Sequence, residues 1–197
     1  SRLPEVRNAL RQSRTAPVSG VDRSTRCTFA RVDLQALQSN FRAIGEFLAA
    51  DPARQPGEPP PGIIAVVKAN AYGHGAPAVA LALQDAGATL LACADIEEGI
   101  VLRKAGVTGE ILIFGALGVS DVDGVFEYRL TPTISTPGAG RSLQAAAARH
   151  GVTLACHLKI DTGMNRLGLR FDNLEHTLPE LIASRNLHVT AVYTHFA

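Results

Sequence analysis

The sequence predicts a protein of the α/β class, built from repeated strand and helix units. Six short apolar runs are separated by helical patterns, and they cover residues 63–68, 89–94, 111–114, 130–134, 153–160 and 188–194. These runs do not alternate between apolar and polar residues, as expected of parallel strands that are covered on both faces. About six βα units therefore favour either a (β/α)8 barrel or a doubly wound sheet.

The first helix is predicted directly after Asp33, whose side chain suits an N-cap. The apolar residues that recur there at helical spacing are Leu34, Leu37, Phe41, Ile44 and Leu48. Residues 51–62 are rich in proline, which lacks the backbone donor that helices and sheets require. We therefore expect this segment to be a loop, not a domain boundary.

Two later helices have recognisable ends. Asp95, Glu97 and Glu98 place negative charge where the dipole of one helix favours it, and Gly106 suits the end of that helix. The other helix is marked by Asp172 and by the apolar residues Leu174, Leu178, Leu181 and Ile182.

The number of strands bears on the length of the protein. A (β/α)8 barrel needs eight strands and roughly 250 residues, whereas this chain has 197 residues and stops after the sixth predicted strand. An arc of about six strands would have two edges with unpaired backbone groups and a partly unfilled interior. We therefore interpret the sequence as a fragment of a longer polypeptide.

The composition narrows the classes of partner and compartment. The 46% hydrophobic content allows a sizeable core in one domain, and the net charge of +1 gives no long-range attraction for nucleic acid or an anionic membrane. The three cysteines, Cys27, Cys93 and Cys156, are too few and odd in number for a disulfide framework, which favours the reducing cytoplasm. Residues 1–26 are rich in arginine with weak apolar periodicity, so we predict a disordered extension, with a transit peptide as the alternative.

A lysine follows the first predicted strand and opens the strongest motif. Lys68 ends the apolar run 63–68, and residues 68–75 read KANAYGHG, with Tyr72 four positions after the lysine. A buried strand that delivers an amine into a loop of small residues suits a lysine that must be neutral to react with a carbonyl. From position alone, a surface lysine is an equally good interpretation.

A second motif has the sequence KIDTGMNRLG and covers residues 159–168. On a strand, Lys159 and Asp161 share one face, and Arg166 follows in the next loop. If that face is a barrel interior, the three side chains converge at the carboxyl end of the strand, where barrel enzymes keep their catalytic groups. The alternative is a surface ion pair.

The histidines carry little signal individually. His195 lies in VYTHFA at the carboxyl end of the last predicted strand, where a histidine is more often structural than functional. His150 is expected at a helix end before Gly151, and His157 and His188 lack the spacing of metal ligands, so we predict no metal site.

One competing pattern is a dinucleotide-binding fingerprint at residues 73–78, with Asp95 about twenty residues later. Its first glycine should make the turn directly after the strand, but residues 68–72 intervene. This spacing argues against the dehydrogenase interpretation.

In order and composition, the three motifs resemble those of alanine racemases, the fold-type III enzymes that use pyridoxal 5'-phosphate. The resemblance covers residues 27–197, and it implies a partial (β/α)8 TIM barrel that binds the cofactor and is truncated after about the sixth strand. It implies that Lys68 binds the cofactor covalently and acts as one base, and that Tyr72 donates to the cofactor phosphate. Arg166 would approach the cofactor's phenolic oxygen and the substrate carboxylate, and His195 would pack against the pyridoxal ring.

Two positions depart from, or vary within, this pattern. Asn165 stands where many members carry glycine, and we expect the turn to be preserved because asparagine tolerates positive φ. Lys159 matches a position that is carbamylated in some members. A carbamate would convert one of two neighbouring cations into an anion that can pair with Arg166.

The resemblance implies a racemase that interconverts L- and D-alanine and is a homodimer at full length. In the family, the base on the opposite face is a tyrosine from the partner's carboxyl-terminal domain. No residue here corresponds to it, so we predict that residues 1–197 are inactive alone. The alternatives are a racemase for serine or a broader range of amino acids, and a pyridoxal-phosphate-binding protein without turnover.

Overall fold

The computed structural model describes residues 29–55, 57–115 and 122–197. Within it, Asp33–Ala197 form one compact unit. The extension predicted over residues 1–26 lies outside the described residues, as does Cys27.

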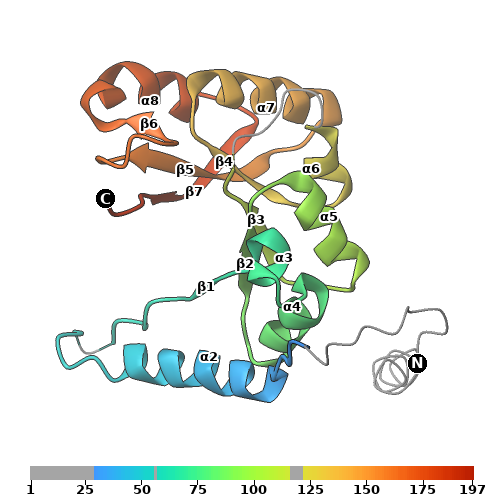
Figure 1. Ribbon diagram of the computed structural model, residues 1–197. Helices are drawn as coiled ribbons and strands as arrows, with labels where there is room; N and C mark the ends of the chain where they lie inside the picture. Colours follow the sequence, from blue (N-terminus) through green and yellow to red (C-terminus); the bar gives the residue numbers. More distant parts are fainter. Residues whose placement is uncertain (1–28, 56, 116–121) are drawn as a thin grey trace, which may run out of the picture. The chain divides into compact units, whose positions relative to one another are not determined.

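Helices and strands alternate along the compact unit (Figure 1). In chain order they are α2 (Leu34–Ala49), β1 (Ile64–Val66), α3 (Lys68–Tyr72), α4 (Ala76–Asp85), β2 (Leu90–Cys93), α5 (Ile96–Lys104), β3 (Glu110–Ile113), α6 (Asp123–Glu127), β4 (Thr131–Ile134), α7 (Pro137–His150), β5 (Leu154–Asp161), β6 (Leu169–Arg170), the 3-10 helix η1 (Phe171–Asn173), α8 (Leu174–Ile182) and β7 (Leu187–Tyr193).

All strand pairs in this part of the chain are parallel, and the strands pair in the order β1-β2-β3-β4-β5, with both β6 and β7 beside β5. Strands β1 to β5 are neighbours in chain order, without the reversal of strand order that defines a doubly wound sheet. The structure therefore confirms the parallel α/β barrel arrangement, which here is an open arc. The two-residue strand β6 was not predicted from the sequence, because it is too short to produce a periodic pattern.

The predicted ends of several helices are confirmed. Asp33 Oδ1 accepts hydrogen bonds from the amides of Gln35 and Ala36 at 3.0 Å each, and Asp95 Oδ1 accepts one from Glu98 at 2.8 Å. Helix α7 ends at His150, and Gly151 takes the left-handed C-cap conformation. The described residues of the proline-rich segment 51–62 contain neither helix nor strand.

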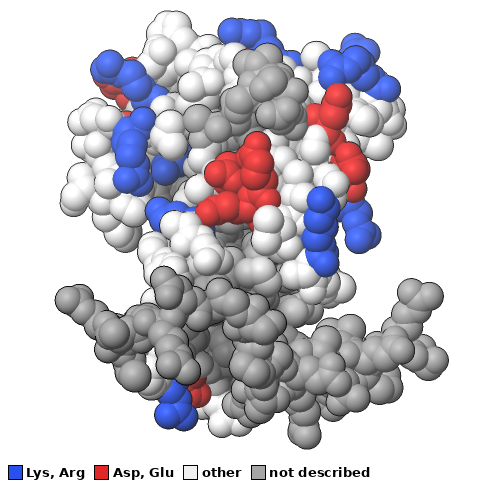
Figure 2. All heavy atoms as spheres, turned by 45° about the vertical axis from the view of Figure 1, so that its right-hand side comes forward, with Lys and Arg blue, Asp and Glu red and all other residues white. Residues whose placement is uncertain are grey.

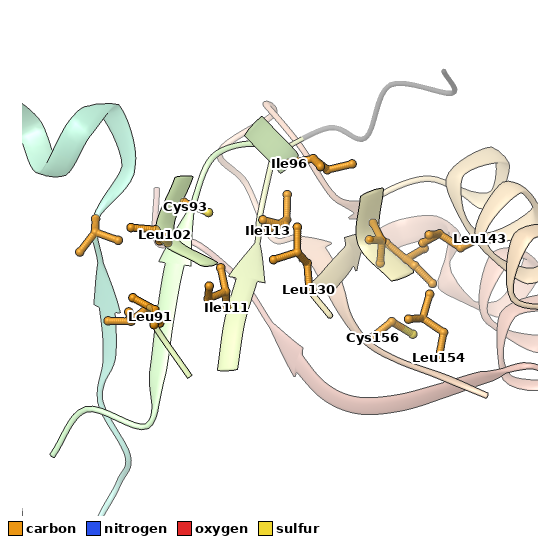
Figure 3. Close-up of a cluster of buried hydrophobic side chains, with 14 of the residues drawn as sticks. Leu91, Cys93, Ile96, Leu102, Ile111, Ile113, Leu130, Leu143, Leu154 and Cys156 are labelled. Atoms are coloured by element: carbon orange, nitrogen blue, oxygen red, sulfur yellow. The ribbon is translucent and has the colours of Figure 1, made fainter. Parts of the chain in front are cut away.

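The hydrophobic core lies between the outer face of the strands and the helices that follow them (Figure 3). Leu91 and Cys93 of β2 and Ile111 and Ile113 of β3 are almost completely buried there with Leu102 of α5. Because side chains alternate along a strand, the intervening residues face the other side, which is the interior of the arc.

Charged side chains of both signs are interspersed on the face in Figure 2, where an acidic group lies at the centre and basic groups lie around it.

No helix in the described part of the chain is both long and apolar enough to span a membrane.

Candidate active site

Lys68 begins the segment that follows β1. The strand was predicted to reach residue 68 but ends at Val66. The Val67 amide donates to Ala92 O at 2.8 Å, and the chain turns directly after this residue. The half-buried Lys68 places its Nζ 5.3 Å from the centre of the Phe114 ring, which follows β3. A cation over an aromatic face is stabilised by the quadrupole of the ring.

The residues after Lys68 form a left-handed turn. Ala69, Asn70, Ala71 and Tyr72 have φ between 50° and 53°, and none of them is glycine. This conformation costs roughly 1–2 kcal/mol for each residue with a Cβ atom. A run of four such residues requires specific contacts that hold it.

Two side chains bind the backbone of this turn, and the side chain of Asn70 joins the turn to the start of α4. Glu98 Oε1 accepts a hydrogen bond from the Ala69 amide at 2.6 Å, and Asn70 Oδ1 accepts one from the Ala76 amide at 2.7 Å. His74 Nδ1 lies 2.9 Å from the carbonyl oxygen of Ala71. The loop motif therefore includes residues whose function is to maintain the shape of the backbone.

Lys159 lies on the interior face of β5 and is only 6% exposed. Its strand partner on β7 is Tyr193, and Lys159 Nζ lies 5.7 Å from the centre of the Tyr193 ring. The Tyr193 hydroxyl is 3.0 Å from Thr133 Oγ1 on β4. Burial lowers the pKa of Lys159, the nearby cations Arg166 and Lys68 lower it further, and Asp161 opposes the shift.

Asp161 shapes the loop that follows β5. Its Oδ1 accepts hydrogen bonds from the amides of Gly163 and Asn165, both at 3.0 Å, and these bonds hold the pKa of the carboxyl group below its usual value. The alternative of a surface ion pair between Lys159 and Asp161 is wrong, because Lys159 is buried and no salt bridge joins the two side chains.

Three residues in this loop, Gly163, Asn165 and Gly168, have positive φ. Asn165 has φ 55°, which confirms that asparagine takes a left-handed conformation at this position. Gly168 has φ 136°, and a Cβ atom there would lie 2.6 Å from the amide nitrogen of Asp161. The glycine at the end of the second motif is therefore required by a close approach of two backbone segments.

Three of the predicted site residues line one cavity, which is too narrow to hold a water molecule. Lys159, Arg166 and His195 surround it with Asp161 and with the apolar residues Ile160, Met164 and Leu167. Lys68 does not line this cavity, although its charge contributes to the lowered pKa of Lys159. Tyr72 is 60% exposed on the left-handed turn, outside the cavity.

His150 and His157 lie outside this cavity. His150 Nε2 lies 3.1 Å from Asp123 Oδ1, and the His150 ring stacks on Phe126 at 4.3 Å. His157 is buried on β5, and burial lowers its pKa. The described residues contain no group of three or more histidine, cysteine, aspartate and glutamate side chains that could hold a metal ion.

Sequence reasoning assigned no site role to Glu98, Phe114 or Tyr193. Glu98 was interpreted only through the dipole of α5, because its bond to Ala69 spans 29 positions. Phe114 and Tyr193 lie beside the lysines because of pairing between strands, which no local pattern reveals.

Residues 32–197 match the family described as "Alanine racemase, N-terminal domain". An alanine racemase of Carboxydothermus hydrogenoformans is 41% identical over 172 residues, which are 87% of this chain and 44% of that protein. The chain thus spans less than half the length of this relative.

Two solved structures have the same arrangement of strands and helices. The alanine racemase of Clostridium difficile 630 in complex with cycloserine superposes with a TM-score of 0.77 at 30% identity, over 89% of this chain and 46% of that one. A histidine racemase from Leuconostoc mesenteroides subsp. sake superposes with a TM-score of 0.71, also at 30% identity, over 83% of this chain and 42% of that one.

Proposed function

Because the chain belongs to the family of alanine racemase N-terminal domains, we propose that the protein is a pyridoxal-phosphate-dependent amino-acid racemase acting on alanine. One observation carries the proposal. Lys159, Arg166 and His195 line one cavity, and the charge of nearby Lys68 contributes to the lowered pKa of Lys159. Catalytic groups of barrel enzymes lie at this carboxyl-terminal end of the strands.

The side chains present fit pyridoxal phosphate by their chemistry. Lys68 offers an amine for the aldehyde, Arg166 a guanidinium for the phenolic oxygen and the substrate carboxylate, and His195 a flat ring to pack against the pyridine. The exposed phenol of Tyr72 offers a hydrogen-bond donor for the phosphate. When bound, the cofactor spreads the negative charge left by departure of the α-proton.

In this proposal the chain's own residues bind the cofactor, orient the substrate and move one proton. Lys68 would hold the cofactor, and its amine, when free, would remove or return the α-proton on one face. Arg166 orients the substrate carboxylate, for which the planar fork of arginine is better suited than an ammonium.

Racemisation requires a second base on the opposite face. We infer that this base is a tyrosine of the partner subunit in a homodimer, and that residues 1–197 alone do not racemise alanine. The match covers only 44% of the relative from C. hydrogenoformans, which supports this inference. The free, buried thiols of Cys93 and Cys156 support a reducing compartment, and we propose the cytoplasm.

Lys159 is the proposed site of carbamylation. Its lowered pKa increases the fraction of neutral amine, which adds to carbon dioxide and releases one proton, giving an anion beside Arg166. The intact mass in bicarbonate buffer should rise by one carbon dioxide, and peptide mapping should assign this gain to Lys159. A Lys159→Met variant is the control, and an unmodified wild-type lysine in bicarbonate would refute the proposal.

A broader substrate range is the second candidate function, because a histidine racemase shares this fold at 30% identity. The test is the exchange of the α-hydrogen for deuterium in the intact protein with L-alanine, L-serine and L-histidine. We expect exchange with alanine that is lost in Lys68→Ala and reduced about tenfold or more in Arg166→Lys. The matched control is Arg185→Lys, an exposed arginine after α8.

The same assay separates the remaining possibilities. Exchange that is faster with serine or histidine than with alanine would change the substrate but leave the mechanism. Cofactor bound at Lys68 without exchange of any of these amino acids would contradict the racemase and favour a binding protein without turnover.

A further inference from the structure

The carboxylate of Glu98 joins the loops that follow two neighbouring strands. Its Oε1 accepts a hydrogen bond from the Ala69 amide at 2.6 Å, and its Oε2 accepts one from the Ala94 amide at 2.8 Å. Ala69 comes directly after Lys68, and Ala94 comes directly after β2. One half-buried side chain therefore connects the carboxyl ends of β1 and β2.

This arrangement differs from ordinary capping of a helix. In a capping box, the acidic residue at the third helical position binds the amide of the N-cap residue itself. Here Asp95 makes one of the two capping-box hydrogen bonds, since its Oδ1 accepts from the Glu98 amide at 2.8 Å. Glu98 instead binds Ala94, one residue before the cap, and Ala69, which belongs to another loop.

The bond to Ala69 acts where the backbone leaves the strand. The last bond that pairs the two strands runs from the Val67 amide to Ala92 O, and Ala69 is the first residue of the left-handed turn. A right-handed conformation is otherwise preferred by residues with a Cβ atom. Both sides of Lys68 are therefore held in place, because strand pairing fixes Val67 and the Glu98 carboxylate fixes Ala69.

We propose that Glu98 is a positioning residue for Lys68, an inference that depends on the function proposed above. By binding the amides of Ala69 and Ala94, it maintains the left-handed turn and thereby directs the Lys68 amine toward the aldehyde of pyridoxal phosphate. It does not touch the reacting atoms, and it acts through the backbone of the residue that does.

The test substitutes Glu98→Gln. The glutamine side chain has one acceptor oxygen, whereas the backbone amides of Ala69 and Ala94 each need an acceptor. The first measurement is the hydrogen exchange of the Ala69 and Ala94 amides by NMR without cofactor. We expect at least one of these amides to exchange about tenfold faster or more in the variant. The second measurement is the rate at which Lys68 becomes covalently attached to pyridoxal phosphate, trapped with borohydride and located by peptide mass. It should fall on the order of tenfold.

Two variants control for charge and for stability. Glu97→Gln removes an exposed charge from the same turn of α5 and should leave both measurements unchanged. Thr136→Ala removes the side-chain oxygen that caps α7 at 3.1 Å, so it should lower the thermal midpoint without slowing attachment at Lys68.

The outcomes separate the two proposals. Attachment in Glu98→Gln as fast as in Glu97→Gln would overturn the positioning role and leave the racemase proposal standing. A slowing equal to that in Thr136→Ala would also overturn it, because stability alone would then explain the effect. Absence of attachment at Lys68 in the wild-type protein would instead refute the proposed function.

Discussion

The side-chain nitrogen of Lys159 lies over the ring of Tyr193, with 5.7 Å between Nζ and the ring centre. The two residues are partners on the adjacent strands β5 and β7, so strand pairing sets their separation. Tyr193 also contacts β4 through Thr133, whose side chain is only 1% exposed. Tyr193 therefore packs against the buried side chain of Lys159 and links strands β4, β5 and β7.

Removing the Tyr193 hydroxyl should destabilise the fold but leave the environment of Lys159 intact. Tyr193→Phe keeps the ring and deprives the buried Thr133 hydroxyl of its 3.0 Å partner. The free energy of unfolding in urea should fall by about 1–3 kcal/mol. Tyr193→Leu also removes the aromatic face and should cost more. Equal stability of all three proteins would contradict this account.

In the left-handed turn, a substitution to glycine should stabilise the fold. Ala69 is exposed with φ 50°, so Ala69→Gly relieves a strain of roughly 1–2 kcal/mol at an added unfolded-state entropy of about 0.4–1 kcal/mol. We expect a net stabilisation of up to about 1 kcal/mol by chemical denaturation. The same substitution at Ala145, exposed in the right-handed helix α7, should destabilise by about 1 kcal/mol. Destabilisation at both positions would argue against the left-handed turn.

Gly168 should not tolerate a side chain. Its φ is 136°, and an added Cβ atom would meet the Asp161 amide at 2.6 Å and the Ile160 carbonyl carbon at 2.9 Å. Gly168→Ala should therefore lower the free energy of unfolding by about 2 kcal/mol or more. Gly138→Ala is the control, since its nearest neighbour would be 3.9 Å away. Wild-type stability of Gly168→Ala would show that the loop can move without penalty.

The buried thiols predict a loss of stability in alkaline solution. Burial is the main cause that raises the pKa of Cys93 to about 12 and that of Cys156 to about 11, from 9.0 for the unfolded chain. Below pH 9 both states keep these protons, so the thiols add no pH dependence there. Above pH 9 the unfolded state loses protons that the folded state retains, so stability falls with rising pH.

Each thiol should contribute a slope approaching ~1.4 kcal/mol per pH unit between pH 9 and 11. The measurement compares the urea stability of wild type with that of Cys93→Ala/Cys156→Ala across this range, since other groups titrate equally in both. The difference between the two proteins should shrink as pH rises. A constant difference would mean that the folded thiols ionise as freely as the unfolded ones.

Much of the fold is predictable because its signals are local. Continuous apolar runs predict the buried parallel strands, and Asp33 and Asp95 predict the starts of α2 and α5. The left-handed turn is not predictable in this way, since alanine and tyrosine favour other conformations. It depends on Glu98, whose partner Ala69 lies 29 residues away.

The candidate site is predictable in its residue types more than in its contacts. The motifs identify Lys159, Arg166 and His195, which the structure brings to one cavity. Phe114 beneath Lys68 and Tyr193 beneath Lys159 come from the pairing of strands, and their positions depend on register.

The most direct test asks which amine reacts with pyridoxal phosphate. The chain has three lysines, Lys68, Lys104 and Lys159. Lys104 is a natural control, because its Nζ also lies over an aromatic ring, at 5.9 Å from the centre of Tyr128, but on the exposed surface of α5. Borohydride reduction after incubation with equimolar cofactor, followed by peptide mass mapping, should place the pyridoxyl group on Lys68, and Lys68→Ala should remain unlabelled. Labelling spread over Lys104 and Lys159, or unchanged in Lys68→Ala, would contradict the central claim.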